Sequence, residues 1–107
     1  MDKALKKKWV AALRSGKYRQ GRGKLRTGTS HGGHAKYCCL GVLCEVVGVH
    51  RIGDSFYEYE YDGSSYSLPL PLRDKLMVYS DIQEVLVNMN DRGESFRTIA
   101  DWIEENL

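Results

Sequence analysis

Several features that would assign a function directly are missing from this sequence. It has no GxxxxGK[ST] phosphate loop, no GxGxxG dinucleotide fingerprint, no HExxH zinc helix and no GxSxG serine elbow. Its apolar runs are far shorter than the ~20 residues that a membrane-spanning helix requires. The lysine-rich start lacks the apolar block and the small-residue cleavage site of a secretory signal. We therefore expect a cytoplasmic protein with no membrane segment.

Cysteine is also scarce. The chain has three cysteines, an odd number, and all of them lie in the stretch "YCCLGVLC". A secreted disulfide framework would use an even number, spread out so that the bridges close loops. Reduced thiols in a reducing compartment fit this arrangement better.

Acidic residues are nearly absent from the first third of the chain. Residues 1–37 hold 11 lysines and arginines and one acid, whereas residues 38–107 hold five and 13, so the two parts carry charges of +10 and −8. Such asymmetry suggests an anionic partner for the basic part. The alternative is that the two parts neutralise each other inside the folded molecule.

The hydrophobic periodicity predicts a single α+β domain over residues 1–107, with three to four helices packed on a small antiparallel sheet. Helical spacing marks 3–15, with Gly16 as the terminating residue, and the apolar stretch 37–48 reads as a buried helix or strand. "FYEYEY" and "SSYSLPL", separated by Asp-Gly, predict a hairpin, which Pro69 and Pro71 end.

Two helices are predicted in the last third of the chain. Ser80 and Gln83 match a capping box, and the helix that follows is expected to break over 90–93. Ser95 is expected to cap the last helix. The apolar face of this last helix comprises Phe96, Ile99, Ala100, Ile103 and Leu107.

A zinc site is the first chemistry to consider. The candidate ligands are Cys38, Cys39, Cys44, His31 and His34. Adjacent cysteines followed by a gap of four residues fit the usual pairs of zinc ligands poorly, and thiols in an apolar run behave as small hydrophobic groups. We therefore favour buried thiols, with no metal and no cofactor.

An enzyme would need an activated group. Cys38, at the border of the basic part of the chain and the apolar run, is the best candidate nucleophile, and a helix beginning there would lower its pKa. Glu58 and Glu60 are the candidate paired carboxylates, but on a strand they would share the solvated face. The sequence favours a binding protein over an enzyme.

An anion site is the strongest functional prediction. The stretch "YRQGRGKLR" offers the cations Arg19, Arg22, Lys24 and Arg26. Its glycines, Gly21 and Gly23, would let backbone amides approach a phosphate closely, and arginine supplies a two-pronged contact. Tyr18 or Tyr37 is expected to stack on a base, beside Cys38. Gln20, Asn90 and Asp91 are expected to bind its polar edges, although turn formation also explains Asn90 and Asp91.

Three blocks in order resemble a family of small uncharacterised bacteriophage proteins. They are YxQGxGxLR at 18–26, YCCLGVLC at 37–44 and MND…SFxxIADxIE from residue 89. The resemblance covers both ends and the cysteine block, and it implies a phage-encoded accessory protein acting in a bacterial cytoplasm. It implies no particular activity. Accessory proteins of phages often counter host defence.

Together, these observations predict a phage protein that binds an anionic, nucleotide-like ligand, such as a host immune signal. One alternative is a protein-interaction module that inhibits a host enzyme, with Glu58, Glu60, Glu104 and Glu105 imitating nucleic-acid charge. Another is binding of RNA or DNA by the basic part. The sequence also leaves open whether the protein forms a homo-oligomer.

Overall fold

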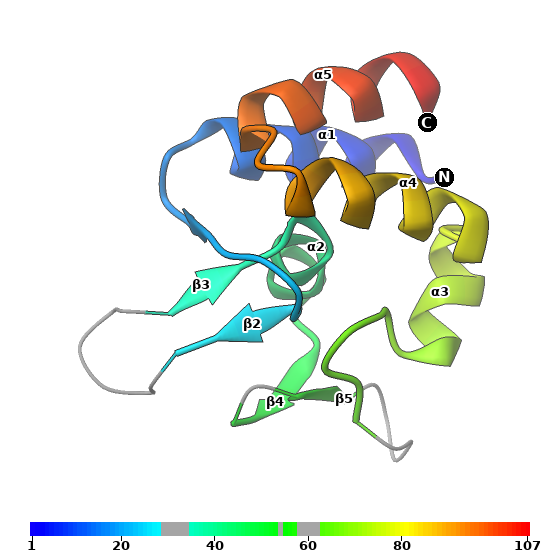
Figure 1. Cartoon of the computed structure of the whole chain (residues 1–107). Helices are drawn as coiled ribbons and strands as arrows, with labels where there is room; N and C mark the ends of the chain where they lie inside the picture. The colour runs from blue at the N-terminus through cyan, green and yellow to red at the C-terminus, as the bar shows by residue number, and fades with distance from the viewer. Residues whose placement is uncertain (29–34, 54, 58–62) are drawn as a thin grey trace.

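A computed structural model describes residues 1–28, 35–53, 55–57 and 63–107 (Figure 1). Within these ranges the chain forms five helices and five short strands. The helices are α1 (Lys3–Arg14), α2 (Cys39–Val47), α3 (Leu70–Leu76), α4 (Ser80–Asp91) and α5 (Phe96–Asn106). The strands are β1 (Arg19–Gln20), β2 (Arg26–Thr27), β3 (Lys36–Tyr37), β4 (His50–Ile52) and β5 (Ser55–Tyr57). The α+β class is confirmed. The helices outnumber the prediction because the segment after Pro69 forms a helix of seven residues.

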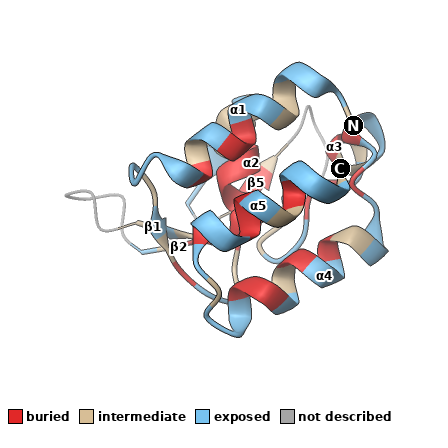
Figure 2. Cartoon of the chain, turned by 90° about the horizontal axis from the view of Figure 1, so that it is seen from above, coloured by how far each residue is buried: buried red, intermediate tan, exposed pale blue. Residues whose placement is uncertain are grey.

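The helix α2 lies at the centre of the molecule (Figures 1 and 2). Its residues 39–44 are all buried, as the apolar run predicts, and Gly48 ends it in the left-handed conformation. Gly41 faces the backbone of Leu25 so closely that a Cβ there would lie 1.8 Å from the Leu25 carbonyl oxygen. Only glycine allows the helix to pack this closely against the backbone of Leu25.

The helices α1 and α5 lie side by side above α2 (Figure 1). In α1, Trp9, Val10 and Leu13 are buried, and the indole nitrogen of Trp9 donates a hydrogen bond of 2.9 Å to the Cys39 carbonyl. This bond satisfies the one polar atom of a large buried side chain. Gly16 follows α1 with φ +74°, as expected for a residue just past a helix end.

The predicted cap of α5 is confirmed, and the predicted capping box of α4 is wrong. The Ser95 hydroxyl accepts a hydrogen bond from the Thr98 amide. In contrast, the residue that precedes α4 is Tyr79, and no side-chain hydrogen bond caps the helix there. The Gln83 side chain instead turns into the core, where it accepts from the Leu68 amide at 3.0 Å and donates to the Val78 carbonyl at 2.8 Å.

The strands form a three-stranded sheet in the order β1-β3-β2 and a two-stranded sheet of β4 and β5. The three-stranded sheet is mixed and not wholly antiparallel as predicted, because β1 pairs with β3 in parallel and β2 pairs with it antiparallel. Part of the predicted hairpin, including 58–62, lies outside the described residues; the part that is described pairs Phe56 with Ser64 through a single bridge. No helix among the described residues has the length and apolar character needed to cross a bilayer.

Candidate anion-binding surface

The basic loop, residues 18–26, is fastened to the turn between α4 and α5. The Gln20 amide nitrogen donates to Asn90 Oδ1 at 3.1 Å and to the Glu94 carbonyl at 2.6 Å. Its amide oxygen accepts a hydrogen bond of 3.1 Å from the Phe96 backbone nitrogen. This nitrogen lies in the first turn of α5, where backbone N–H groups have no partner within the helix. All the hydrogen-bonding atoms of the Gln20 side chain therefore serve the fold.

Asn90 and Asp91 complete this fastening. Asn90 is fully buried, and its side-chain nitrogen donates to the Gly21 carbonyl at 2.7 Å. Asp91 accepts a hydrogen bond of 3.1 Å from the Gly23 amide. The residues predicted to bind the edges of a base thus hold the loop in place. In this structure a ligand would have to displace these internal hydrogen bonds to reach them.

The structure also explains why glycine occupies positions 21 and 23 of the basic loop. A Cβ at Gly21 would lie 2.8 Å from Lys36 Cβ, and Gly23 has φ +83°. The amides of the loop point inward: Gly21 donates to the Tyr37 carbonyl at 2.7 Å, and Leu25 donates to the Ser65 carbonyl at 2.8 Å. Because the amides of Gly21 and Gly23 are already bonded, the predicted backbone cradle for a phosphate is not formed.

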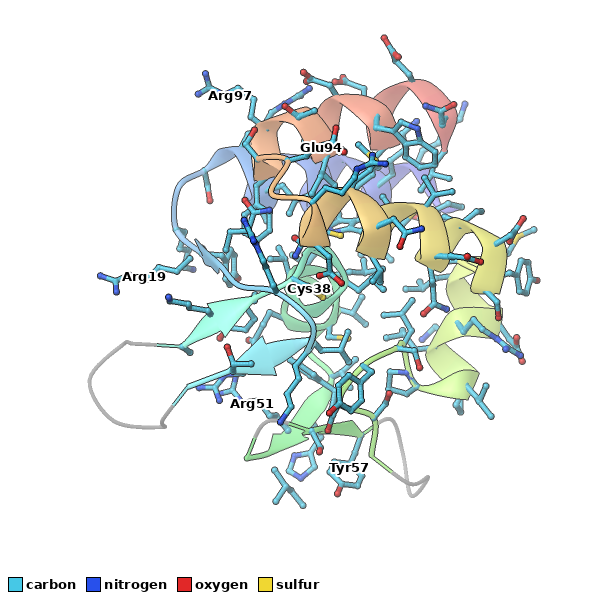
Figure 3. All side chains as sticks on the ribbon, in the orientation of Figure 1. Arg19, Cys38, Arg51, Tyr57, Glu94 and Arg97 are labelled. Carbon is cyan, nitrogen blue, oxygen red and sulfur yellow. The ribbon has the colours of Figure 1, made fainter. Side chains whose placement is uncertain are left out.

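The four cations of the loop do not converge on one point. Arg26 is 6% exposed, and its guanidinium donates to the Tyr37 hydroxyl and to the Gly53 carbonyl, both at 3.4 Å. The Arg22 guanidinium lies over Gly93, and Lys24 Nζ lies 6.0 Å from the centre of the Tyr66 ring. Arg19 points away from the ribbon (Figure 3). The expectation that these cations enclose one pocket is therefore not met.

The two candidate stacking residues lie against each other. The rings of Tyr18 and Tyr37 meet edge to face, with their centres 5.3 Å apart. The Tyr37 hydroxyl donates to Glu45 at 3.4 Å, and Glu45 also forms an ion pair with Arg51. Partial burial, with the negative charge of Glu45 and the neighbouring Tyr37, raises the pKa of Tyr18. These contacts hold the inner face of the sheet on the core.

Cys38 lies in the core and not in a ligand site. Its side chain is 3% exposed, and burial raises its pKa, so the thiolate that a nucleophile or a ligand contact needs is disfavoured. Cys38 is the residue before α2, but this position does not overcome the cost of burying the charge. All three cysteines are buried, and no disulfide joins any of them to another described residue.

No group of three or more potential metal ligands occurs among the described residues. His31 and His34, the other candidate zinc ligands, lie outside those residues, and so do Glu58 and Glu60. Glu104 and Glu105 were the other residues considered for imitating nucleic-acid charge. Glu104 forms an ion pair with Arg14, and Glu105 is exposed.

The register of the three-stranded sheet brings a different pair of cations together. Arg19 is opposite Lys36 on β1 and β3, and Thr27 on β2 is opposite Lys36 from the other side. Residues opposite each other in a sheet share one face, so Arg19, Lys36 and Thr27 form a row on the outward face. Gln20, Tyr37 and Arg26 form the next row and face inward. Lys36 was not among the predicted site residues, because nothing local in the sequence predicts parallel pairing across 17 residues.

The chain was also compared with known proteins. A family model described as a domain of unknown function, DUF8296, matches residues 1–73. The chain belongs to this family. The matched region of DUF8296 runs from α1 into α3, so it contains the basic loop and the sheet, while the fastening residues Asn90 and Asp91 lie beyond it. No curated protein and no solved structure matches the chain significantly.

Proposed function

We propose that this protein binds an anionic, nucleotide-like ligand on the outward face of the three-stranded sheet. The observation that supports the proposal is the register of Arg19 with Lys36. Like charges directly opposite each other on a sheet destabilise it, and neither residue forms an ion pair with a carboxylate among the described residues. A bound phosphate would remove that repulsion.

The row supplies three kinds of donor suited to phosphate oxygens. Arg19 provides a planar guanidinium, Lys36 an ammonium and Thr27 a hydroxyl. Arg19 and Lys36 are exposed, so a ligand reaches them without unfolding any part of the sheet. The fastening of the basic loop by Gln20 and Asn90 fixes the strand that carries Arg19, which reduces the cost of ordering the site on binding.

The biological setting follows from the sequence blocks that resemble phage proteins. We place the protein in the cytoplasm of an infected bacterium, where it acts as an accessory protein without enzymatic activity. Capture of a nucleotide-like immune signal of the host would counter defence, because it lowers the free concentration of that signal. Such capture requires only binding, which fits a surface whose described residues include cations but no activated nucleophile.

Calorimetric titration with mononucleotides, dinucleotides and cyclic nucleotides tests the proposal. The variant R19A/K36A should weaken binding about 5- to 30-fold, since two exposed charge contacts are each worth roughly 0.5–1 kcal/mol. The matched control is R73A/K75A, which removes one arginine and one lysine from α3, away from the sheet (Figure 1). The control should bind like the unchanged protein.

Two results would reject the proposal. One is the absence of heat with every nucleotide tested. The other is equal weakening of binding in both double variants, which would indicate general charge attraction. A single-stranded RNA or DNA oligonucleotide that binds with a steep salt dependence, when nucleotides do not bind, would favour the nucleic-acid alternative instead.

A further inference from the structure

The helices α1 and α5 lie side by side (Figures 1 and 2), and residues of both line a groove. Its volume is about 580 Å³. It is lined by Lys3, Lys6, Lys7, Val10, Ala11, Arg14 and Glu104. None of these residues belongs to the outward row of the three-stranded sheet, so the groove is a separate surface.

The lining contains four cations and one carboxylate. Two of the cations are used internally. Arg14 forms ion pairs of 2.6 Å with Asp101 and with Glu104, and Lys6 Nζ donates to the Glu104 carbonyl at 2.9 Å near the end of α5. Hydrogen bonds to these two carboxylates raise the pKa of Arg14. These contacts join the two helices and set the width of the groove.

Lys3 and Lys7 are the cations that remain. Both are exposed, and neither forms an ion pair within the described part of the chain. They stand four residues apart on one helix face, where like charges destabilise the helix. The helix therefore carries a local electrostatic cost that a negatively charged partner would remove.

The floor of the groove is apolar. Val10 is buried at its base, and Ala11 is exposed beside it. The small side chain of Ala11 leaves room for a ridge of side chains from a partner. A concave, apolar floor between cations suits an amphipathic helix, which lays its apolar face into a groove and keeps charges at its edges.

We propose that the groove between α1 and α5 binds an acidic amphipathic helix of a partner protein. Charge complementarity selects the acidic helix, since its carboxylates would face Lys3 and Lys7 while its apolar residues cover Val10 and Ala11. A phosphate backbone offers no apolar group for this floor, and a flat bilayer surface does not enter a groove. The proposal is independent of nucleotide binding by the sheet.

The test uses a fluorescent helical peptide of about 15 residues, with leucines along one face and glutamates on the others. Its binding to the full chain is followed by fluorescence anisotropy. The peptide should bind, and the same peptide with lysine in place of glutamate should not. The variant K3E/K7E should weaken binding at least about tenfold, because it replaces attraction with repulsion.

Two further variants separate the groove from general charge. K8E/K75E changes the net charge by the same amount with exposed lysines outside the lining, and it should leave binding unchanged. Ala11→Leu keeps the charge but fills the floor, so it should weaken binding while circular dichroism shows a folded protein. Nucleotide titration of K3E/K7E should match that of the unchanged protein, since the row of Arg19 and Lys36 is intact.

Three outcomes would overturn the proposal. The first is no binding of the acidic peptide. The second is equal weakening in K3E/K7E and K8E/K75E, or no effect of Ala11→Leu, which would leave only unspecific attraction. The third is that a single-stranded oligonucleotide or a phosphatidylserine vesicle binds through Lys3 and Lys7 while the peptide does not.

Discussion

Replacing Asn90 by alanine removes the centre of the fastening between the basic loop and the turn after α4. The Asn90 side chain is fully buried and makes hydrogen bonds of 2.7 Å to the Gly21 carbonyl and 3.1 Å from the Gln20 amide. The Gln20 nitrogen keeps its second partner, the Glu94 carbonyl, but the buried Gly21 carbonyl loses its side-chain donor. An unsatisfied buried acceptor costs roughly 1–3 kcal/mol, and a lost hydrogen bond about 1 kcal/mol.

Alanine favours a helix over asparagine by up to about 0.7 kcal/mol, which offsets a part of this loss. We therefore expect Asn90→Ala to lower the free energy of unfolding by about 2–3 kcal/mol. Urea unfolding at neutral pH, followed by circular dichroism, should show a lower midpoint with an unchanged slope. Asn88→Ala is the control, because Asn88 is exposed in the same helix and should be neutral or slightly stabilising. Equal midpoints for the two variants would refute the assigned role of Asn90.

Three further predictions concern α2 and Cys38, the residue before it. Gly41→Ala should lower the free energy of unfolding by more than about 2 kcal/mol in the same urea assay, because the new Cβ would lie 1.8 Å from the Leu25 carbonyl oxygen. A variant as stable as the unchanged protein would contradict this contact. Cys38 and Cys39 should react with iodoacetamide far more slowly in the folded protein than in urea, since burial raises the pKa of both thiols. Fast alkylation of the folded protein at neutral pH would contradict the burial of these thiols. Because the folded-state pKa lies above the unfolded one, these thiols should also make the free energy of unfolding fall as the pH rises above the ordinary thiol range.

Local signals predicted the helices well. The periodic face of α5 and its cap at Ser95 depend on residues within a few positions of one another, so a single sequence contains the whole signal. The burial of the cysteines in α2 follows equally from a short apolar run. The capping box at Ser80 failed because Gln83 has better partners in the core, namely the Leu68 amide and the Val78 carbonyl.

The candidate site was less predictable because its contacts are distant in the sequence. Residue types at Gln20 and Asn90 suggest polar recognition, but the sequence does not reveal that these two side chains bind each other across 70 positions. The pairing of Arg19 with Lys36 depends on a parallel register that no turn between the strands specifies. The excess of positive charge in the basic part does not form a single site. One arginine is buried, some cations contact aromatic rings, and others lie on two separate exposed surfaces.

The packing of α1 on α5 has a consequence for how the molecule is made. During synthesis the first helix emerges long before the last one, and in the finished molecule these two are neighbours. Until α5 has been translated, the surface of α1 that α5 covers remains open to solvent. The Gln20 side chain also lacks the hydrogen bond that it accepts from the Phe96 amide in the folded protein. The contacts between α1 and α5 can therefore form only after α5 has been made, and proteolysis of ribosome-bound chains that lack α5 should find α1 less protected than in the folded protein.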